Sequence, residues 1–484
     1  MSDRTAVRAL VVARMRGNSR GAKGRRKVEC VTFRQTEGTS AKVLKETKQV
    51  EEAALWKRTR LREVAEPCVW TERMLTALVE GVKGGKWFSL MDKVYAKRTL
   101  KCAWNHVRQN GGAAGADKQT IDFFAEDCDK RLDKLHRELK DGTYQPQPVR
   151  RTWIDKEGKR EKRPLGIPAV RDRIVQTALL LVLEPIFERE FLPNSFGFRR
   201  GIGCKDALRE VDGLLKDGYC WVVDVDFKSY FDTIHHDRLM DLISQRISDG
   251  RIHDLLRAYL NAEVLDGIQR WQPEEGTPQG AVISPLLSNI YLHELDVRMM
   301  RAGYRMIRYA DDFVVLCESE EQANAALNEV HAFASDFGLT IHPTKTRIGN
   351  SRRKGDGFDF LGYHFECGKR WVSRKKLPAL RARLRPRLKR TSGQSLEDII
   401  ASINPTLRGW FEYFQHSHWN VFETVDGWVR KRLRSILRKR QKRKGSARGR
   451  DHQRWPNSYF TAHGLFSLKQ AYELKRQSLI CGNH

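Results

Sequence analysis

The sequence lacks the features that mark several common classes of protein. No apolar run approaches the roughly 20 residues that a membrane-spanning helix requires, and the longest covers only residues 178–183. The N-terminal region soon becomes rich in arginine and has no apolar core of a secretory signal. We therefore expect a soluble protein that is not exported.

The Gly-rich stretch at 110–120 lacks the Gly-Lys-Ser/Thr ending of a phosphate-binding loop.

Closely paired cysteines are also missing. Nine cysteines are scattered along the chain, and no two have CxxC spacing. The histidines at 235, 236, 416 and 418 lack cysteine or acidic partners at ligand spacing. The sequence therefore predicts reduced thiols in a cytosolic protein, with neither a zinc cage nor a disulfide framework.

Basic residues are abundant and unevenly placed. Lysine and arginine outnumber aspartate and glutamate by 89 to 60, giving a net charge of +29. Residues 370–450 hold 23 basic and 5 acidic residues, and residues 1–66 hold 17 basic and 8 acidic. Such blocks suit a polyanion, because each phosphate that they neutralise releases counterions, whereas a single charge run is usually a solvated surface. Aromatic residues also interleave with the basic residues at 370–450, which favours nucleic acid over a membrane surface as the partner.

The chain changes character along its length. Residues 1–66 have little apolar periodicity and are expected to be a flexible basic extension. A hairpin-like segment at 149–168, with its turn at 155–158, precedes an amphipathic helix at 171–190. Strands and helices alternate over 219–365, and helices alone follow.

Local signals refine this outline. Two short strands are expected at 304–310 and 313–317, with Asp311 and Asp312 as the two-residue turn between them. Residues 358–365 have the pattern of one strand.

Helix boundaries have signals of their own. Ser284 is expected to cap a helix, and another is predicted at 320–337. Pro386 should kink or divide a helix. Ser395 resembles a capping box, and Pro405 is expected to open the next helix.

Acidic residues stand where the pattern otherwise requires burial. Asp224 and Asp226 lie two apart at the end of an apolar strand, and Asp311 and Asp312 interrupt a second apolar run. An acidic pair in a turn is common, because Asp tolerates positive φ. An uncompensated buried carboxylate is costly, however, and a bound divalent cation is a standard compensation. If Asp226 meets the turn, three hard oxygen donors suit Mg²⁺.

Four motifs in fixed order resemble the palm motifs of reverse transcriptases. They are DFKSYFD at 226–232, TPQGAVISPLLSN at 277–289, YADD at 309–312 and FLGY at 360–363. RPLGIP at 163–168 and FGFRRG at 196–201 narrow the resemblance to the bacterial type encoded by group II introns. LRGWFEYF at 407–414 is similar to the maturase-specific thumb of those proteins. The resemblance runs from about residue 70 to the C-terminus.

This resemblance implies a catalytic centre. Asp226 and Asp311 would be the principal metal ligands, with Asp312 assisting. Phe227 would belong both to the metal site and to the nucleotide-binding site. Two Mg²⁺ ions, replaceable by Mn²⁺, would activate a primer 3′-hydroxyl and stabilise departing pyrophosphate. Lys345 would protonate that pyrophosphate, although a plain surface lysine is an alternative.

It also implies positions for the substrates. Phe231 would exclude a ribose 2′-hydroxyl, and it can equally be an ordinary core residue. Gln279 would lie against the incoming deoxynucleoside triphosphate, or simply cap a helix. Lys162 and Arg163 would hold the triphosphate, or be two more charges on a basic hairpin. Leu361 and Gly362 would lie near the primer end, or belong to an unremarkable strand. Asp224, Asp232 and Asp237 are assigned structural roles.

The fold class implied is α+β, a right-hand polymerase with a ferredoxin-like palm, helical fingers and an all-helical thumb. The expected divisions are a basic extension at 1–66, fingers at 67–215, palm at 216–372, thumb at 373–450 and a tail at 451–484 that is a candidate for DNA binding. The reaction would be RNA-directed DNA synthesis. The partners would be group II intron RNA, an RNA template, a DNA primer or target and deoxynucleoside triphosphates, in a bacterial cytoplasm at the nucleoid.

Many relatives carry a further zinc-dependent HNH endonuclease with cysteine pairs. Only Cys481 follows residue 367 here, so we expect that domain to be absent. Relatives of this kind use existing DNA ends as primers, and the resemblance implies the same here.

Two other functions stay open. A related bacterial reverse transcriptase could serve phage defence or CRISPR adaptation, and genomic context would decide. A catalytically silent splicing factor could bind RNA alone, although the intact aspartates argue against it.

Overall fold

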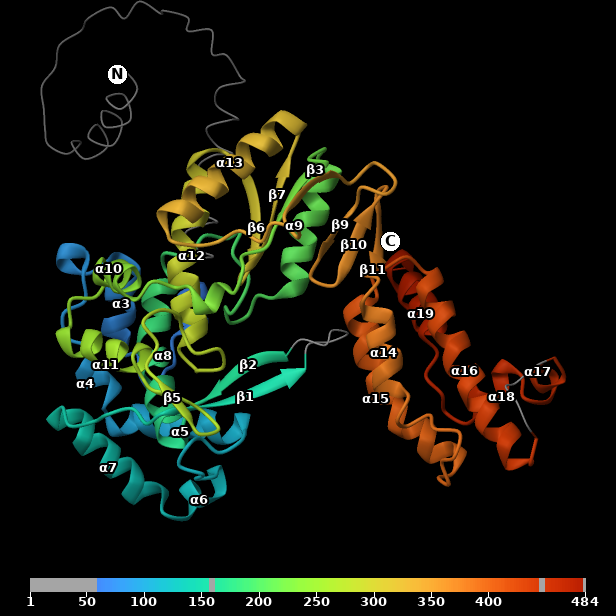
Figure 1. The fold of residues 1–484 in the computed structure, drawn as a ribbon, viewed down its shortest axis with the longest axis horizontal. Helices are drawn as coiled ribbons and strands as arrows, with labels where there is room; N and C mark the ends of the chain where they lie inside the picture. The colour runs from blue at the N-terminus through green and yellow to red at the C-terminus, as the bar shows by residue number, and fades with distance from the viewer. Residues whose placement is uncertain (1–58, 156–161, 444–448, 482–484) are drawn as a thin grey trace, which may run out of the picture. The chain divides into compact units, whose positions relative to one another are not determined.

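The computed structural model describes residues 59–155, 162–443 and 449–481. The chain divides into two units, residues 1–56 and 57–484, and all the described residues belong to the second (Figure 1). Two hydrophobic cores organise this unit. No helix among the described residues is long and apolar enough to cross a membrane.

Helices form the first part of the unit. They are α3 (Glu72–Glu80), α4 (Met91–Val94), α5 (Lys97–Asn110), α6 (Ile121–Glu126), α7 (Cys128–Asp141) and α8 (Val170–Glu188), with a 3-10 turn η2 (Lys83–Gly85). Leu61 and Ala65 are buried in the first core, although the sequence assigned both to the basic extension. The described part of that extension is therefore built into the fold.

Helix α8 differs from its prediction. It begins one residue earlier than expected and is buried on all sides rather than amphipathic. Its acidic residues are paired instead of solvated, since Asp172 accepts a hydrogen bond from the Tyr144 hydroxyl at 2.6 Å and Glu188 contacts Arg60 and Arg199 at 2.7 and 2.8 Å. A helix packed on every side is central to its domain.

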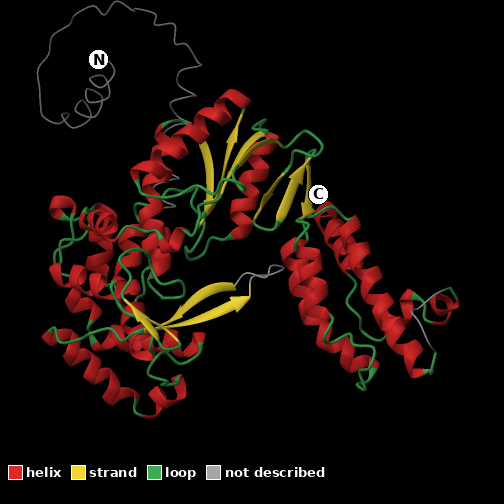
Figure 2. Ribbon diagram, in the orientation of Figure 1, coloured by secondary structure: helices red, strands yellow, loops and turns green. Residues whose placement is uncertain are grey.

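A four-stranded antiparallel sheet lies between the two cores. Strands are drawn in yellow in Figure 2. The order of this sheet is β6 (Arg305–Tyr309), β7 (Asp312–Cys317), β3 (Trp221–Val225) and β8 (Arg347–Asn350). Because side chains alternate along a strand, Val223 and Val225 enter the first core while Val222 enters the second. Helices α12 (Ser284–Arg301) and α13 (Glu320–Asp336) contribute to the first core, and α9 (Cys204–Lys216) contributes to the second.

The β6–β7 turn lies one residue earlier than predicted. Tyr309 pairs with Asp312, so Ala310 and Asp311 form the turn and Asp312 opens β7. Ala310 has φ of 60°, a left-handed conformation that aspartate tolerates better than alanine does. A Cβ on Gly197 would lie 2.0 Å from the Ala310 nitrogen, so the backbone of the turn packs directly on Gly197. Position 197 must therefore be glycine.

A second sheet carries another correction. Residues 358–365 form two strands, β9 (Phe358–Phe360) and β10 (Tyr363–Glu366), which pair with each other and with β11 (Lys369–Val372). Leu361 and Gly362 form the turn between β9 and β10, with φ of 48° and 81°. The FLGY motif is therefore a hairpin and not one strand.

The third sheet contains the predicted hairpin. Strands β1 (Val149–Asp155) and β2 (Lys162–Ile167) are antiparallel, and β4 (Val264–Asp266) and β5 (Gln269–Trp271) extend the sheet. The expected turn at 155–158 lies outside the described residues after Asp155. Helices α10 (His236–Ser244) and α11 (Gly250–Leu260) precede β4.

After residue 372 the described residues form helices and no strands, as predicted. They are α14 (Lys376–Leu384), α15 (Leu396–Phe414), α16 (Asn420–Arg440), α17 (Arg450–Arg454), α18 (Asn457–Ala462) and α19 (Leu468–Cys481). Helix α14 ends before Pro386, and Ser395 caps α15 by accepting from the Asp398 nitrogen at 3.0 Å.

The prediction that Pro405 opens a helix is wrong. Helix α15 runs through Pro405, and two contacts hold this point. The Asn404 amide donates to the Gly464 carbonyl at 2.8 Å and accepts from the Phe466 nitrogen at 3.0 Å. Ser284 is likewise the first residue of α12 and not its cap, which is Ile283.

Candidate active site

Acidic side chains gather where strand β3 ends beside the β6–β7 turn. Val225 pairs with Phe313 in β7, so the next step of the register sets Asp226 opposite Asp312. Asp311 belongs to the adjoining turn. Asp224 lies two residues before Asp226 and therefore on the same face of β3. The fold thus brings together acidic residues that are almost 90 positions apart in the sequence.

Burial and neighbouring charge raise the pKa values of three of these carboxylates, Asp224, Asp311 and Asp312. Loss of hydration raises the pKa of Asp312 to about 7, and the charges of Asp224, Asp311 and Asp226 add to the effect. Asp312 is reached by water, yet it lies at the wall of two cavities where neighbouring protein atoms displace part of its hydration. Burial likewise raises the pKa of Asp224 to about 6 and, with the charge of Asp226, raises that of Asp311.

Basic residues offset only part of this charge. The Lys345 ammonium lies 2.5 Å from Asp226 Oδ2, and Arg347 lies 3.8 Å from Asp224. Lys345 was predicted to reach pyrophosphate, and in the structure its nearest partner is the Asp226 carboxylate. The Arg163 charge also lowers the pKa of Asp311, against the stronger effect of burial.

The donor set fits a hard divalent cation. Several carboxylates crowd together with raised pKa values, so the site favours either protonation or a bound positive charge. All the side-chain donors are oxygens, and Mg²⁺ prefers one or two carboxylates completed by water and phosphate. Asp226, Asp311 and Asp312 are the residues whose carboxylates could hold such an ion.

A cavity of about 820 Å³ adjoins the carboxylates. Six of the residues predicted from sequence line it, namely Arg163, Phe231, Gln279, Asp311, Asp312 and Leu361.

Other predicted residues lie elsewhere. Lys162 is exposed at the start of β2. Phe227 is buried, with its ring against Phe313. Gly362 lines a second cavity of about 570 Å³.

Two distant motifs meet through glycine at this cavity. Gly280 has φ of 106°, and a Cβ there would lie 2.6 Å from the Gly166 carbonyl oxygen. The Gly166 nitrogen donates to the Gln279 carbonyl at 2.6 Å. The Arg163 guanidinium donates to the Gln279 side chain at 2.9 Å. Close backbone approach therefore fixes Gln279 beside Arg163.

Phe231 is held from its backbone. It lies in a 3-10 turn, η3 (Tyr230–Asp232). Its carbonyl accepts a hydrogen bond from the Thr277 nitrogen at 2.7 Å, and the Tyr230 hydroxyl donates to the Ser288 carbonyl at 2.9 Å. The Phe231 ring can therefore be both a core residue and part of the cavity wall, as expected.

Sequence reasoning missed the residues that hold the aspartate turn. Arg308 is fully buried and forms two hydrogen bonds to Asp296, at 2.7 and 2.5 Å. It also donates to Asn289 at 2.9 Å and to the Ala310 carbonyl at 3.0 Å. Asn289 in turn donates to the Gly197 carbonyl at 2.8 Å. The signal was available, because an arginine in a buried strand needs a buried partner.

The second turn at the cavity is held by the C-terminal helices. The Tyr413 hydroxyl, on α15, donates to the Leu361 carbonyl at 2.7 Å. The Gly362 carbonyl accepts from the Ser373 nitrogen at 2.9 Å. The 570 Å³ cavity beside this turn is lined by Asp312, Lys376 and Arg383 among others.

Comparison with known proteins assigns the class. Residues 154–365 match the family model of reverse transcriptase (RNA-dependent DNA polymerase). Residues 377–455 match the maturase-specific domain of group II introns. The protein is thus a member of the reverse transcriptase class with an attached maturase-specific domain.

Curated relatives narrow this class to one family. Group II intron-encoded protein LtrA of Lactococcus lactis is 38% identical over 254 residues, covering 52% of this chain and 40% of LtrA. Protein YkfC of Escherichia coli is 37% identical over 274 residues, covering 48% of this chain and 70% of YkfC. The chain belongs to the family of group II intron-encoded reverse transcriptases, as predicted, and its match spans less than half the length of LtrA.

Solved structures are more distant. A partial Cas6-RT-Cas1–Cas2 complex has 22% identity and a TM-score of 0.33, covering 51% of this chain and 41% of that one. Telomerase from Candida albicans, solved with a fragment of telomeric RNA, has 12% identity and a TM-score of 0.38, covering 66% and 64%. Scores this low carry no argument about the arrangement of the parts.

Proposed function

We propose that the protein copies RNA into DNA, by attack of a primer 3′-hydroxyl on a deoxynucleoside triphosphate. One observation carries the proposal, namely that Asp311 and Asp312 line the same 820 Å³ cavity as Arg163, Phe231 and Gln279. A site for a nucleoside triphosphate requires a cationic side chain that binds phosphate, a planar apolar wall, and charged side chains at one end of the cavity. Arg163, Phe231 and the two aspartates provide these in turn.

Metal binding is proposed at Asp226 and Asp311, with Asp312 assisting. When bound there, two Mg²⁺ ions, or Mn²⁺ in their place, supply charge that offsets the attacking and departing oxygens. Phe227 can contribute only its backbone carbonyl, since its ring packs against Phe313. Lys345, whose Nζ lies 2.5 Å from Asp226 Oδ2, is the residue proposed to donate a proton to departing pyrophosphate.

Nucleotide recognition is proposed for the opposite part of the cavity. The Arg163 guanidinium offers forked donors to phosphate oxygens while Gln279 orients it. Lys162, at the exposed start of β2, adds a second positive charge. The Phe231 ring, which lines the cavity, is proposed to exclude a ribose 2′-hydroxyl. Leu361 and Gly362 would contact the primer end.

The proposed architecture is a right hand. Fingers span 67–215, a ferredoxin-like palm spans 216–372 and contains the sheet with the aspartates, and an all-helical thumb spans 373–450. Residues 1–66 are the proposed extension. Residues 451–484 are the proposed DNA-binding tail, of which α19 packs on α16 through Phe422 and Tyr472.

A second proposed role is binding of group II intron RNA to assist its splicing, followed by copying of that RNA during intron mobility. The maturase-specific match at 377–455 and the basic excess at 370–450 support this role. Phosphate contacts and RNA shape would dominate such recognition.

Primer extension on an RNA template tests the enzyme. Asp311→Asn should lower the rate at least about a thousandfold, whereas the exposed Asp237→Asn should retain it. Phe231→Ala should incorporate ribonucleotides more readily. Full activity of Asp311→Asn would refute the assigned site. An inactive wild-type protein that still promotes intron splicing would identify a silent splicing factor instead.

A further inference from the structure

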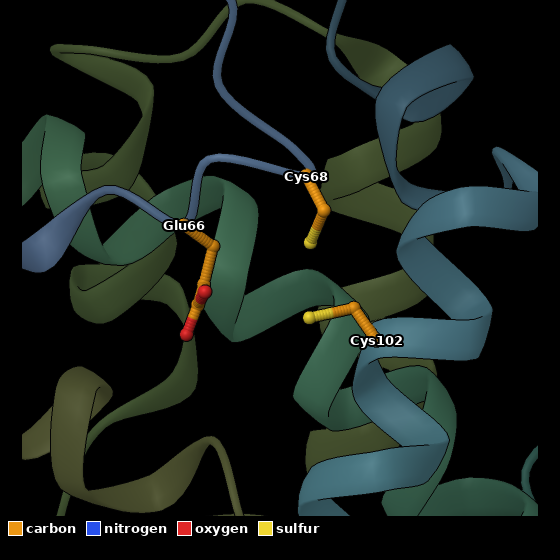
Figure 3. Close-up of side chains that lie close together, drawn as sticks. All are labelled: Glu66, Cys68 and Cys102. Carbon is orange, nitrogen blue, oxygen red and sulfur yellow. The ribbon is translucent and has the colours of Figure 1, made fainter.

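A cluster of sulfur and oxygen donors lies outside the proposed active site. The Glu66 carboxylate and the Cys68 and Cys102 thiols have ligand atoms within 4.8 Å of one another. Figure 3 shows the two thiols directed toward the same space, with the carboxylate beside them. Glu66 and Cys68 precede α3, whereas Cys102 lies in α5. A search for closely spaced cysteines misses this group, because its members are joined only by the fold.

We propose that Glu66, Cys68 and Cys102 form a binding site for a thiophilic divalent cation, with Zn²⁺ as the natural ligand. Zinc binds thiolates at about 2.3 Å and carboxylates at about 2.0–2.2 Å. Ligand atoms around one tetrahedral ion would therefore be about 3.5–4 Å apart. The three ligand atoms already lie within 4.8 Å of one another, so small rotations of the side chains would bring them to this spacing.

Surrounding residues orient the carboxylate in the way that metal sites require. Glu66 Oε1 lies 3.3 Å from His106 Nε2 and 3.2 Å from the Arg200 guanidinium. Glu66 Oε2 takes part in neither contact and is the oxygen proposed as the metal donor. Partners of this kind hold a ligating carboxylate in place. His106 is one helical turn after Cys102 in α5, so the two reach the same locality.

The charge of the site also suits the ion. Arg200 is shared between Glu66 and Glu184, which it contacts at 3.0 Å. One guanidinium therefore faces two carboxylates. A divalent cation that displaces both thiol protons leaves the net charge unchanged.

The site would tie the start of the described chain to the first core. Arg60 pairs with buried Glu188, and Leu61 is buried. Cys68 follows within eight residues and faces α5. A bound ion would thus cross-link this entry segment to a helix of the core and stabilise the fold. It is separate in chemistry from the aspartate centre, which offers oxygen donors alone.

Cobalt(II) titration of the purified full chain tests the proposal. One equivalent should produce sulfur-to-cobalt charge-transfer absorption that Zn²⁺ abolishes, whereas an oxygen-only centre gives none. Cys68→Ser and Cys102→Ser should each weaken the band, and the double variant should remove it. Glu66→Gln should keep the band but lower affinity by about tenfold or more. The matched control is Cys128→Ser, at the start of α7, which should behave as wild type.

Alkylation of the wild-type protein avoids any folding defect of the variants. Zn²⁺ should protect Cys68 and Cys102 from alkylation, as read by mass spectrometry, and leave the exposed Cys367 reactive. Three results would each overturn the proposal: no charge-transfer band at one equivalent of cobalt, a band unchanged in the double variant, or a Cys68–Cys102 disulfide in protein purified without reductant.

Discussion

The two tight turns at the large cavity are held by different means. The Ala310–Asp311 turn is fixed from within its own sheet region, by a buried Arg308–Asp296 pair and by the Gly197 backbone. The Leu361–Gly362 turn is fixed by a hydroxyl from α15 and a backbone hydrogen bond from Ser373. Carboxylate geometry therefore depends on correct folding of the sheet region, whereas the second turn depends on the C-terminal helices.

The largest effect is expected at Arg308. Arg308→Met leaves the buried Asp296 charge without its partner and should lower the free energy of unfolding by about 3–5 kcal/mol. Urea denaturation followed by circular dichroism measures it. Arg308→Met with Asp296→Leu should recover part of the loss.

Arg298 supplies the control for this comparison. It pairs with Glu329 and Asp336 at a partly exposed position, so Arg298→Met should cost no more than about 1 kcal/mol. Equal losses for Arg298→Met and Arg308→Met would show that burial of the pair does not hold the first turn.

Two glycine substitutions give the next contrast. A Cβ on Gly197 would meet backbone atoms of the first turn at 2.0 Å, so Gly197→Ala should destabilise by about 1–3 kcal/mol and displace Asp311. A Cβ on Gly362 would meet its neighbours no closer than 3.5 Å, so Gly362→Ala bears only the cost of positive φ, about 1 kcal/mol. Thermal unfolding and primer extension should rank the two variants in this order, and the reverse order would contradict the steric account.

The first turn should also respond to pH. The pKa of Asp312 is about 7 in the folded protein and about 3.9 in an unfolded chain. The folded state thus binds more protons between these values, and its stability should fall as pH rises from about 4 to about 7. Melting temperatures measured in chelator should show this slope, and Asp312→Asn should reduce it. Asp224 titrates in the same window, so the slope should not vanish. An unchanged slope in Asp312→Asn would exclude this carboxylate as a source.

The smallest effect is expected at the second turn. Tyr413→Phe removes the hydroxyl that binds the Leu361 carbonyl and should cost about 1 kcal/mol. If this turn contacts the primer, KM for primer–template should rise a few fold while kcat changes little. Tyr459→Phe, on α18, is the matched control. A fall in kcat with constant KM would argue that the turn acts on the chemical step.

These contrasts show what could be predicted from sequence. Strand ends carrying aspartates, the cap at Ser395 and the helix break before Pro386 follow from local rules of propensity and burial, and the structure has all three. Nucleotide-binding roles for Arg163, Phe231 and Gln279 were implied by the resemblance to reverse transcriptases, and in the structure the three line one cavity, where Gly166 contacts Gly280.

Other features depend on distant parts of the chain. The position of the aspartate turn is set by Gly197, more than a hundred residues away. Polar residues of α8 indicated a solvent face but are paired inside the core. Pro405 indicated a helix start, yet contacts of Asn404 with Gly464 and Phe466 keep α15 continuous. None of these partners can be read from local pattern.

Asp312 and Leu361 line both the 820 Å³ and the 570 Å³ cavity. The two spaces therefore share a wall made of one carboxylate and one turn. A small-molecule inhibitor that fills both spaces must pass between them beside these two residues. Its linker should therefore place a hydrogen-bond donor against Asp312 and an apolar group against Leu361. Resistance substitutions at either residue would reshape both spaces at once.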